Sequence, residues 1–383
     1  MADATPSYRW LIHATNGWGL GHVVRTLALA RQIRARSPKS EILFLTNSEA
    51  SNLIWREGFA SVKLPSAQSI HQGLIENRIA IPLGRALTAG VAAAFRPQVL
   101  ISDTFPLGGN TELLPMLASW AHRILIYREV PQAVVSAPEI QEILRRYHLI
   151  LSAHQPGQAP MTFPPEVKVR EVGDILIRSR DEGLPRDEAR RRLGLPIDGF
   201  HVFFGLGGGG DDRYMEFFER IVAKAQSMAG WTLVWPVPPL LRKSGETAVD
   251  SRVKAVSYFP LAEVWRAFDG AITFMGANTL AELMHNGVPT IFLPPREGMA
   301  DDQRSRGDRI AKHDAGWLLK SLDDDALAAA FTALADSEWR AAVSANARKL
   351  VPANGAVAAA EFLLSYLKTI KNLGLAPPYV PPT

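Results

Sequence analysis

The chain has 383 residues, of which 47% are hydrophobic and 21% are charged. These values exclude a disordered protein, and the length favours two hydrophobic cores over one. Cysteine is absent, which excludes disulfides and thiolate zinc sites and favours a cytoplasmic location. The net charge is only +4, and no basic stripe interleaved with aromatics indicates nucleic-acid binding. The apolar runs are too short to span a bilayer, so we predict no transmembrane segment and leave peripheral membrane contact and oligomeric state open.

In the first part of the chain, short apolar runs alternate with segments of helical periodicity. Amphipathic stretches at 23–36 and 110–123 read as helices between the apolar runs. This alternation is typical of βα units on a parallel sheet that is covered on both faces. The predicted strands are 10–15, 41–47, 61–65, 98–103, 123–129 and 149–154.

The proline-rich stretch HQPGQAPMTFPPEVKV (154–169) breaks this pattern, and we place the end of the first domain at residue 165. A second alternating series follows, so we expect two Rossmann-like, doubly wound α/β domains, 1–165 and 166–352, facing a cleft. In the closing part, 353–383, an amphipathic helix is expected to cross back to the first domain before a Pro-rich tail. The predicted strands of the second domain are 201–206, 231–237, 253–259, 269–276 and 288–294, with a helix at 213–228.

Each domain opens with a strand, a glycine-rich loop and a helix. The first loop, NGWGLGHVVR at 16–25, contains Gly19 and Gly21. The second contains a run of four glycines, 207–210, of which Gly207, Gly208 and Gly209 are candidate ligand-binding residues. A tight turn would explain either loop alone. Backbone amides at a helix N-terminus bind anions, so the glycine run favours a phosphate-bearing ligand.

The segment 269–319 carries the densest set of candidate site residues. A strand ends at Met275, and Gly276 permits a turn into the helical stretch ANTLAELMHNG. Glu282 lies near the mouth of that helix, and the next strand leads to the loop DDQ at 301–303. A phosphate-binding helix end, a carboxylate and an amide are therefore expected at one rim of the sheet.

This layout resembles GT-B glycosyltransferases, and most closely the MurG-like enzymes of family 28. GANTLAELMHNGVPTIFLP followed by DDQ is similar to the nucleotide-sugar signature of that family, and GLGHVVR to its N-terminal glycine loop. The resemblance implies that the helix end binds the donor diphosphate, the glutamate the ribose hydroxyls and the Asp-Gln pair the donor sugar. These roles fall to Gly276, Ala277, Asn278 and Thr279, then to Glu282, then to Asp302 and Gln303, with Phe259 near the expected base pocket.

The family resemblance also implies the reaction. It is an inverting, metal-independent transfer of a sugar from a nucleotide diphosphate donor, UDP-linked, to a hydroxyl or amine of an unidentified acceptor. No cofactor beyond the nucleotide sugar and no metal site are expected. The chain departs from the family pattern at Met275, where many relatives have arginine, and at Arg306, where many have asparagine.

His22 follows Gly21 on the first turn of a helix, where an imidazole can act as general base on an acceptor hydroxyl. Asp103 ends the strand QVLISD and is the rival base. Glu112 and Arg128 are candidates for the acceptor side. His13 reads as an isolated histidine with an ordinary packing or surface role.

Two other functions stay open. A nucleotide-sugar hydrolase or epimerase of the same fold would use water or the sugar itself in place of an acceptor. A non-catalytic nucleotide-sugar-binding protein would keep Glu282 and the glycines but would not need His22.

Overall fold

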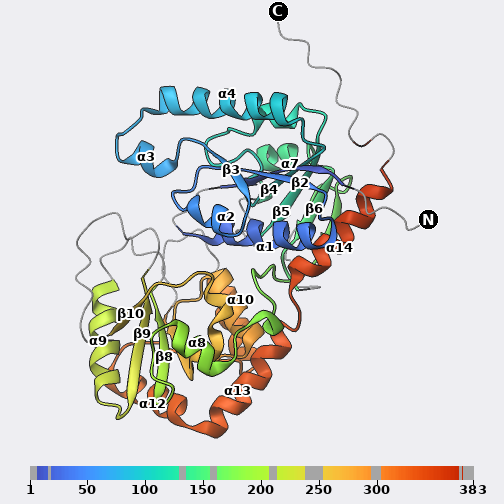
Figure 1. Ribbon diagram of the computed structural model, residues 1–383. Coiled ribbons are helices and arrows are strands. Elements are labelled where there is room, and N and C mark those ends of the chain that lie inside the picture. The colour runs from blue at the N-terminus through green and yellow to red at the C-terminus, as the bar shows by residue number, and fades with distance from the viewer. Residues whose placement is uncertain are drawn as a thin grey trace, which may run out of the picture. The chain divides into compact units, whose positions relative to one another are not determined.

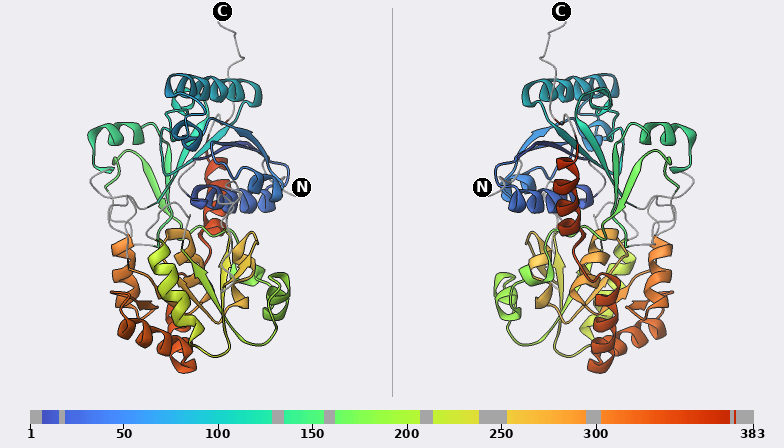
Figure 2. Two further views of the ribbon diagram at one scale, coloured as in Figure 1. Left: turned by 90° about the vertical axis from the view of Figure 1, so that its left-hand side faces the viewer. Right: turned by 90° about the vertical axis from the view of Figure 1, so that its right-hand side faces the viewer.

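The computed structural model describes residues 7–15, 19–128, 135–155, 162–206, 214–237, 253–294, 303–370 and 373. The chain forms two compact units. The first comprises Met1–Ile175 and Gly355–Thr383, and the second comprises Leu176–Asn354. Each is built on an all-parallel sheet flanked by helices, which confirms the predicted fold class (Figures 1 and 2).

The first unit contains a seven-stranded sheet in the order β3-β2-β1-β4-β5-β6-β7. β1 and β4 lie side by side at its centre, and their residues are almost all buried because helices cover both faces. The strands are β1 (Arg9–Ala14), β2 (Glu41–Thr46), β3 (Ala60–Lys63), β4 (Val99–Asp103), β5 (His122–Tyr127), β6 (Leu149–Ser152) and β7 (Lys168–Glu171).

Helix α4 covers one face of this sheet, and α1 and α14 cover the other (Figure 1). The predicted closing helix is α14, and it packs on α1 as expected. The buried face of α14 includes the small residues Ala356, Ala359 and Ala360, which allow close approach. The helices are α1 (Gly21–Arg36), α2 (Asn52–Arg56), α3 (Ala67–His71), α4 (Asn77–Phe95), α5 (Leu114–Leu117), α7 (Pro138–Leu144) and α14 (Gly355–Lys368).

Two predictions made from the sequence differ from the structure of this unit. The helix expected at 110–123 is wrong, because only Leu114–Leu117 is helical; the Glu112 carboxylate binds the backbone amides of Gly109 and Asn110 and holds the chain in a loop. The proline-rich stretch does not end the first unit at residue 165. β7 follows it and pairs with β6, so the unit continues to Ile175.

The second unit contains a six-stranded sheet in the order β10-β9-β8-β11-β12-β13. Helices α9 and α12 pack on one face and bury Phe218, Ile221 and Phe331 against the strands, while α8 and α10 lie on the other (Figure 1). The strands are β8 (Phe200–Gly205), β9 (Trp231–Pro236), β10 (Lys254–Val256), β11 (Gly270–Thr273), β12 (Thr290–Phe292) and β13 (Trp317–Leu318). The helices are α8 (Arg186–Arg192), α9 (Tyr214–Gln226), α10 (Ala277–Asn286), α11 (Gln303–Lys312), α12 (Asp324–Ala335) and α13 (Ser337–Leu350), with the 3-10 turns η1 (Arg180–Glu182), η3 (Leu261–Glu263) and η4 (Trp265–Ala267).

Two segments among the described helices are long and apolar enough to cross a membrane by composition alone. They are Asn77–Phe95, which is α4, and Ser337–Lys368. The second spans α13 and α14, and half of its apolar window is buried inside the fold. Core helices of folded domains pass the same test, so these segments are weak indications of a membrane span.

Candidate active site

In both sheets the candidate residues lie at the carboxyl ends of two central strands. The loop after β1 leads to His22, and β4, its neighbour, ends at Asp103. β8 and its neighbour β11 have the same relationship in the second unit, where β11 leads to Gly276. The strand order reverses between each pair of strands, and open α/β sheets bind their ligands at this point.

His22 is held by the buried carboxylate of Asp103. Its Nδ1 lies 2.6 Å from Oδ2 of Asp103, which is 0% exposed, whereas the His22 side chain is 12% exposed. The second ring nitrogen, Nε2, has no hydrogen-bond partner among the described residues. The geometry therefore orients the imidazole through one nitrogen and leaves the other for a ligand.

Arg25, one turn further along α1, completes this cluster. It is nearly fully buried, and its Nη1 donates to both oxygens of Asp103, at 2.9 and 2.8 Å. Burial opposes ionisation of Asp103, but Arg25 and His22 outweigh it and lower the pKa of the carboxyl below its usual range. We did not identify Arg25 from the sequence; its i, i+3 spacing from His22 was the available signal.

The pKa of His22 is lowered from its ordinary value. Burial is the largest cause, and the positive charges of Arg25 and Arg128 act in the same direction, against the contribution of Asp103. A lowered pKa keeps the imidazole neutral near pH 7, as a general base requires.

Glu112, a candidate for the acceptor side, belongs to a buried hydrogen-bond network. It is buried, and its Oε1 lies 3.0 Å from Nε2 of His13 and accepts a hydrogen bond from Asn47. His13 is therefore paired rather than isolated. By also binding the amides of Gly109 and Asn110, the carboxylate holds the loop after Asp103.

That loop carries an exposed aromatic side chain next to His22. The ring of Phe105 lies 5.5 Å from the imidazole, centroid to centroid, and is 44% exposed. Thr104 and Thr111 both adopt a positive φ, which L-residues rarely do. Such strain is found at functional sites, and no local sequence pattern predicts it here.

In the second unit, β11 leads through Gly276 into α10, as the sequence predicts. Gly276 is the N-cap, and an added Cβ there would meet nothing within 4 Å. Gly276, Ala277, Asn278 and Thr279 are all half-buried. The first backbone N–H groups of a helix have no carbonyl partner within the helix, so this end has the geometry of an anion site.

Glu282 lies on the second turn of α10 with only 9% of its surface exposed. Its Oε2 accepts a hydrogen bond of 3.0 Å from Nε1 of Trp265. Burial raises the pKa of Glu282 to about 7, against the opposing effects of Trp265 and the charge of Arg178. Arg178 itself donates to Glu263, which also accepts from Tyr258.

Gln303 is the first residue of α11 and is 6% exposed. Its Oε1 has no hydrogen-bond partner among the residues that the structure describes, a costly state for a buried amide. Arg306, one turn later, is buried and donates from Nε to the carbonyl of Met275 at 2.9 Å. Two positions that depart from the family pattern thus contact each other and stabilise the entry to α10.

The other predicted ligand-binding residues divide into two groups. An added Cβ at Gly19 would meet no atom within 4 Å, and Gly21 is the first residue of α1. Phe259 follows β10 and is half-buried. Gly207, Gly208, Gly209 and Asp302 lie outside the described residues.

Residues 240–358 match the glycosyltransferase family 28 C-terminal domain. Over most of its length the chain is similar to bacterial proteins named UDP-N-acetylglucosamine--N-acetylmuramyl-(pentapeptide) pyrophosphoryl-undecaprenol N-acetylglucosamine transferase. The protein of Desulforudis audaxviator is 26% identical over 88% of this chain and 93% of its own length. That of Acetivibrio thermocellus is 25% identical over 84% and 88%. The crystal structure of a calicheamicin glycosyltransferase superposes with a TM-score of 0.65 at 16% identity, covering 95% of this chain and 99% of that one.

The two parallel-sheet units, with their loops at the strand-order reversals, have the fold of GT-B glycosyltransferases. The family 28 domain and the relatives over most of the chain confirm the predicted resemblance to MurG-like enzymes.

Proposed function

We propose that the chain transfers a sugar from a UDP-linked donor to a hydroxyl or amine acceptor, with inversion and without a metal ion. The observation that carries the proposal is the His22 imidazole, which is bound to Asp103 through Nδ1 and has no partner at Nε2 within the described part of the chain. Such an arrangement serves a general base that must present one nitrogen to a substrate.

In the proposed step, Nε2 of His22 takes the proton of the acceptor as its oxygen or nitrogen bonds to the anomeric carbon of the donor. The bond between that carbon and the phosphate oxygen breaks, and the nucleoside diphosphate leaves with the electron pair. Asp103 stabilises the imidazolium and is too buried to reach the acceptor itself. A single displacement of this kind inverts the anomeric centre.

The second unit supplies the donor site in this proposal. The amides at the start of α10 stabilise the diphosphate, whose charge grows as the bond breaks, and they can do so without a cation. Glu282 accepts hydrogen bonds from the ribose, and the unsatisfied Oε1 of Gln303 accepts from a sugar hydroxyl. UDP is the favoured nucleotide because the relatives at 25–26% identity are named for a UDP-linked donor.

No cofactor beyond the nucleotide sugar is needed for this step. The cysteine-free sequence supports a cytoplasmic location. The apolar residues Ile79 and Leu83 on α4, 49% and 41% exposed, support peripheral membrane contact.

The test is to incubate the protein with UDP-N-acetylglucosamine, with and without a mixture of lipid-linked and small hydroxylated acceptors, and to follow UDP release and products by mass spectrometry. Acceptor-dependent release that is lost in His22→Ala is expected. Release of free sugar without any acceptor would instead indicate that the protein is a hydrolase. Binding without turnover would indicate a non-catalytic nucleotide-sugar-binding protein.

A further inference from the structure

A hollow of about 610 Å³ lies in the second unit, at the sheet edge opposite the proposed donor site. Asp269, just before β11, and Val288 and Pro289, just before β12, form part of its lining. Asn286 and Gly287, at the carboxyl end of α10, also line it. The proposed diphosphate site lies at the other end of α10 and at the carboxyl ends of the same strands.

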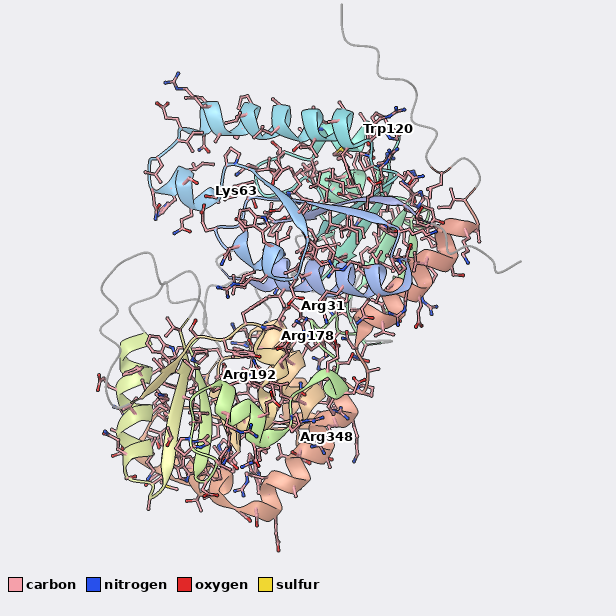
Figure 3. The ribbon with its side chains drawn as sticks, in the orientation of Figure 1. Arg31, Lys63, Trp120, Arg178, Arg192 and Arg348 are labelled. Atoms are coloured by element: carbon pink, nitrogen blue, oxygen red, sulfur yellow. The ribbon has the colours of Figure 1, made fainter. Side chains whose placement is uncertain are left out.

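Five arginines from four segments of the chain converge on this hollow. Two of them come from α13, where Arg340, Ser344 and Arg348 follow one another at i, i+4 and i+8 and therefore share one face of the helix. Arg348 is labelled on α13 in Figure 3. The others are Arg180 in η1, Arg186 at the start of α8 and Arg266 in η4.

Within the described ranges, most of these arginines have no carboxylate partner. Arg186 pairs with Asp269, which Arg190 also contacts at 2.8 Å. The side chains of Arg180, Arg266 and Arg340 donate to backbone carbonyls, as in the 2.7 Å bond from Nε of Arg180 to the carbonyl of His285. Arg348 makes no hydrogen bond or ion pair with the residues that the structure describes, and its side chain is exposed.

The positively charged arginines around the hollow repel one another. The pKa of Arg180 is lowered first by burial and then by the charges of Arg348 and Arg266. Asp181 lines an adjoining hollow of about 400 Å³ that shares Arg180 and Arg266, but it forms no ion pair with either. A multiply charged anion would relieve this repulsion, and guanidinium groups bind phosphate oxygens in pairs.

We propose that this hollow binds a small phosphate-bearing molecule, a free di- or triphosphate, at a site separate from the proposed donor site. Its volume is that of a small-molecule pocket, which favours a free ligand over a membrane surface or a nucleic acid. Binding there does not depend on the proposed function.

Trp265 connects the hollow to the proposed donor site. It lines the hollow, and its Nε1 donates to the carboxylate of Glu282. A ligand that moves Trp265 therefore changes the environment of the group proposed to bind ribose. This effect on nucleotide affinity rests on the proposed function, whereas the binding site itself does not.

The probe is inorganic tripolyphosphate, titrated calorimetrically into the full chain at about 50 mM salt and with UDP present in excess. The decisive variant is Arg348→Glu, because Arg348 is exposed and makes no internal bond. Lys349→Glu is the matched control. It makes the same charge change at the next position of α13, where the side chain is exposed and does not line the hollow.

We expect Arg348→Glu to weaken tripolyphosphate binding roughly tenfold to hundredfold and Lys349→Glu to change it less than about twofold. The melting temperatures of both variants should match the parent. Absence of binding, or equal weakening in both variants, would overturn the site. Arg348-dependent sedimentation with phosphatidylglycerol vesicles without tripolyphosphate binding would overturn the assignment to a free ligand.

The UDP affinity, measured with and without tripolyphosphate, tests the connection through Trp265. A change in the parent protein that disappears in Arg348→Glu is expected. An unchanged UDP affinity would overturn the connection. If UDP does not bind at all, the proposed function fails, and the tripolyphosphate titration still decides the site.

Discussion

Nδ1 of His22 and Oδ2 of Asp103 lie 2.6 Å apart, although 81 positions separate them in the sequence. Because Asp103 is completely buried, in the proposed reaction it would act on a substrate only through the imidazole. The pair therefore behaves as one unit in which Asp103 sets the orientation and protonation of His22.

The first prediction concerns this pair. His22→Ala should lower kcat roughly 10²–10⁴-fold, the usual contribution of a positioned base, with little change in nucleotide affinity. Asp103→Asn should lose a similar factor, because an amide holds the imidazole without favouring its protonated form. The double variant should be no slower than His22→Ala alone, as steady-state kinetics would show. Losses that multiply would mean that the two residues act independently.

The second prediction concerns Arg25, whose charge lowers the pKa of His22. In Arg25→Met that pKa should rise, because Asp103 keeps its effect and the opposing charge is gone. A base with a higher pKa is deprotonated only at higher pH, so the acid limb of kcat/KM should move upward. Arg31→Met is the control: Arg31, labelled in Figure 3, lies on the same helix, and its side chain pairs with Glu57. If the pH profile of kcat/KM is unchanged in Arg25→Met, Arg25 has a packing role alone.

The third prediction is a pH-dependent gain in stability for Glu282→Gln. The folded pKa of Glu282 is about 7, above the ordinary 4.5, so folding favours the protonated carboxyl. Ionisation of Glu282 therefore lowers the free energy of unfolding. This loss is absent below about pH 4.5 and complete above about pH 7, where it amounts to about 3 kcal/mol. Glutamine avoids this loss and still accepts the bond from Trp265. Thermal unfolding should show equal stability at pH 4.5 and a more stable variant at pH 8; a variant less stable at pH 8 would contradict it.

The fourth prediction tests the proposed ribose contact. If Glu282 binds both ribose hydroxyls, UDP should bind more tightly than 2′-deoxy-UDP, which lacks one of them. A hydrogen bond to a charged group corresponds to a preference of roughly tenfold to hundredfold. Glu282→Ala should abolish this preference in calorimetric titrations. Equal affinities in the parent protein would remove Glu282 from the ribose site.

The sequence predicted much of the fold because the relevant signals are local. Buried parallel strands are continuous apolar runs, and each predicted strand of the first domain has a counterpart in the structure. The motif around Gly276 and Glu282 is likewise contiguous, so the helix entry and its carboxylate could be placed from spacing alone. His22 was identifiable for the same reason, since it follows a glycine loop that opens a helix.

Tertiary structure decided the features that depend on distant side chains. The pairing of Arg25 with Asp103, and of Glu112 with His13 and Asn47, joins residues on different strands and loops that no local pattern relates. The prediction of a helix at 110–123 was wrong because the hydrogen bonds that the Glu112 carboxylate accepts from backbone amides outweighed the helical periodicity of this segment. The raised pKa of Glu282 also needs the fold, because desolvation depends on the residues that pack around the carboxyl and not on its neighbours in sequence.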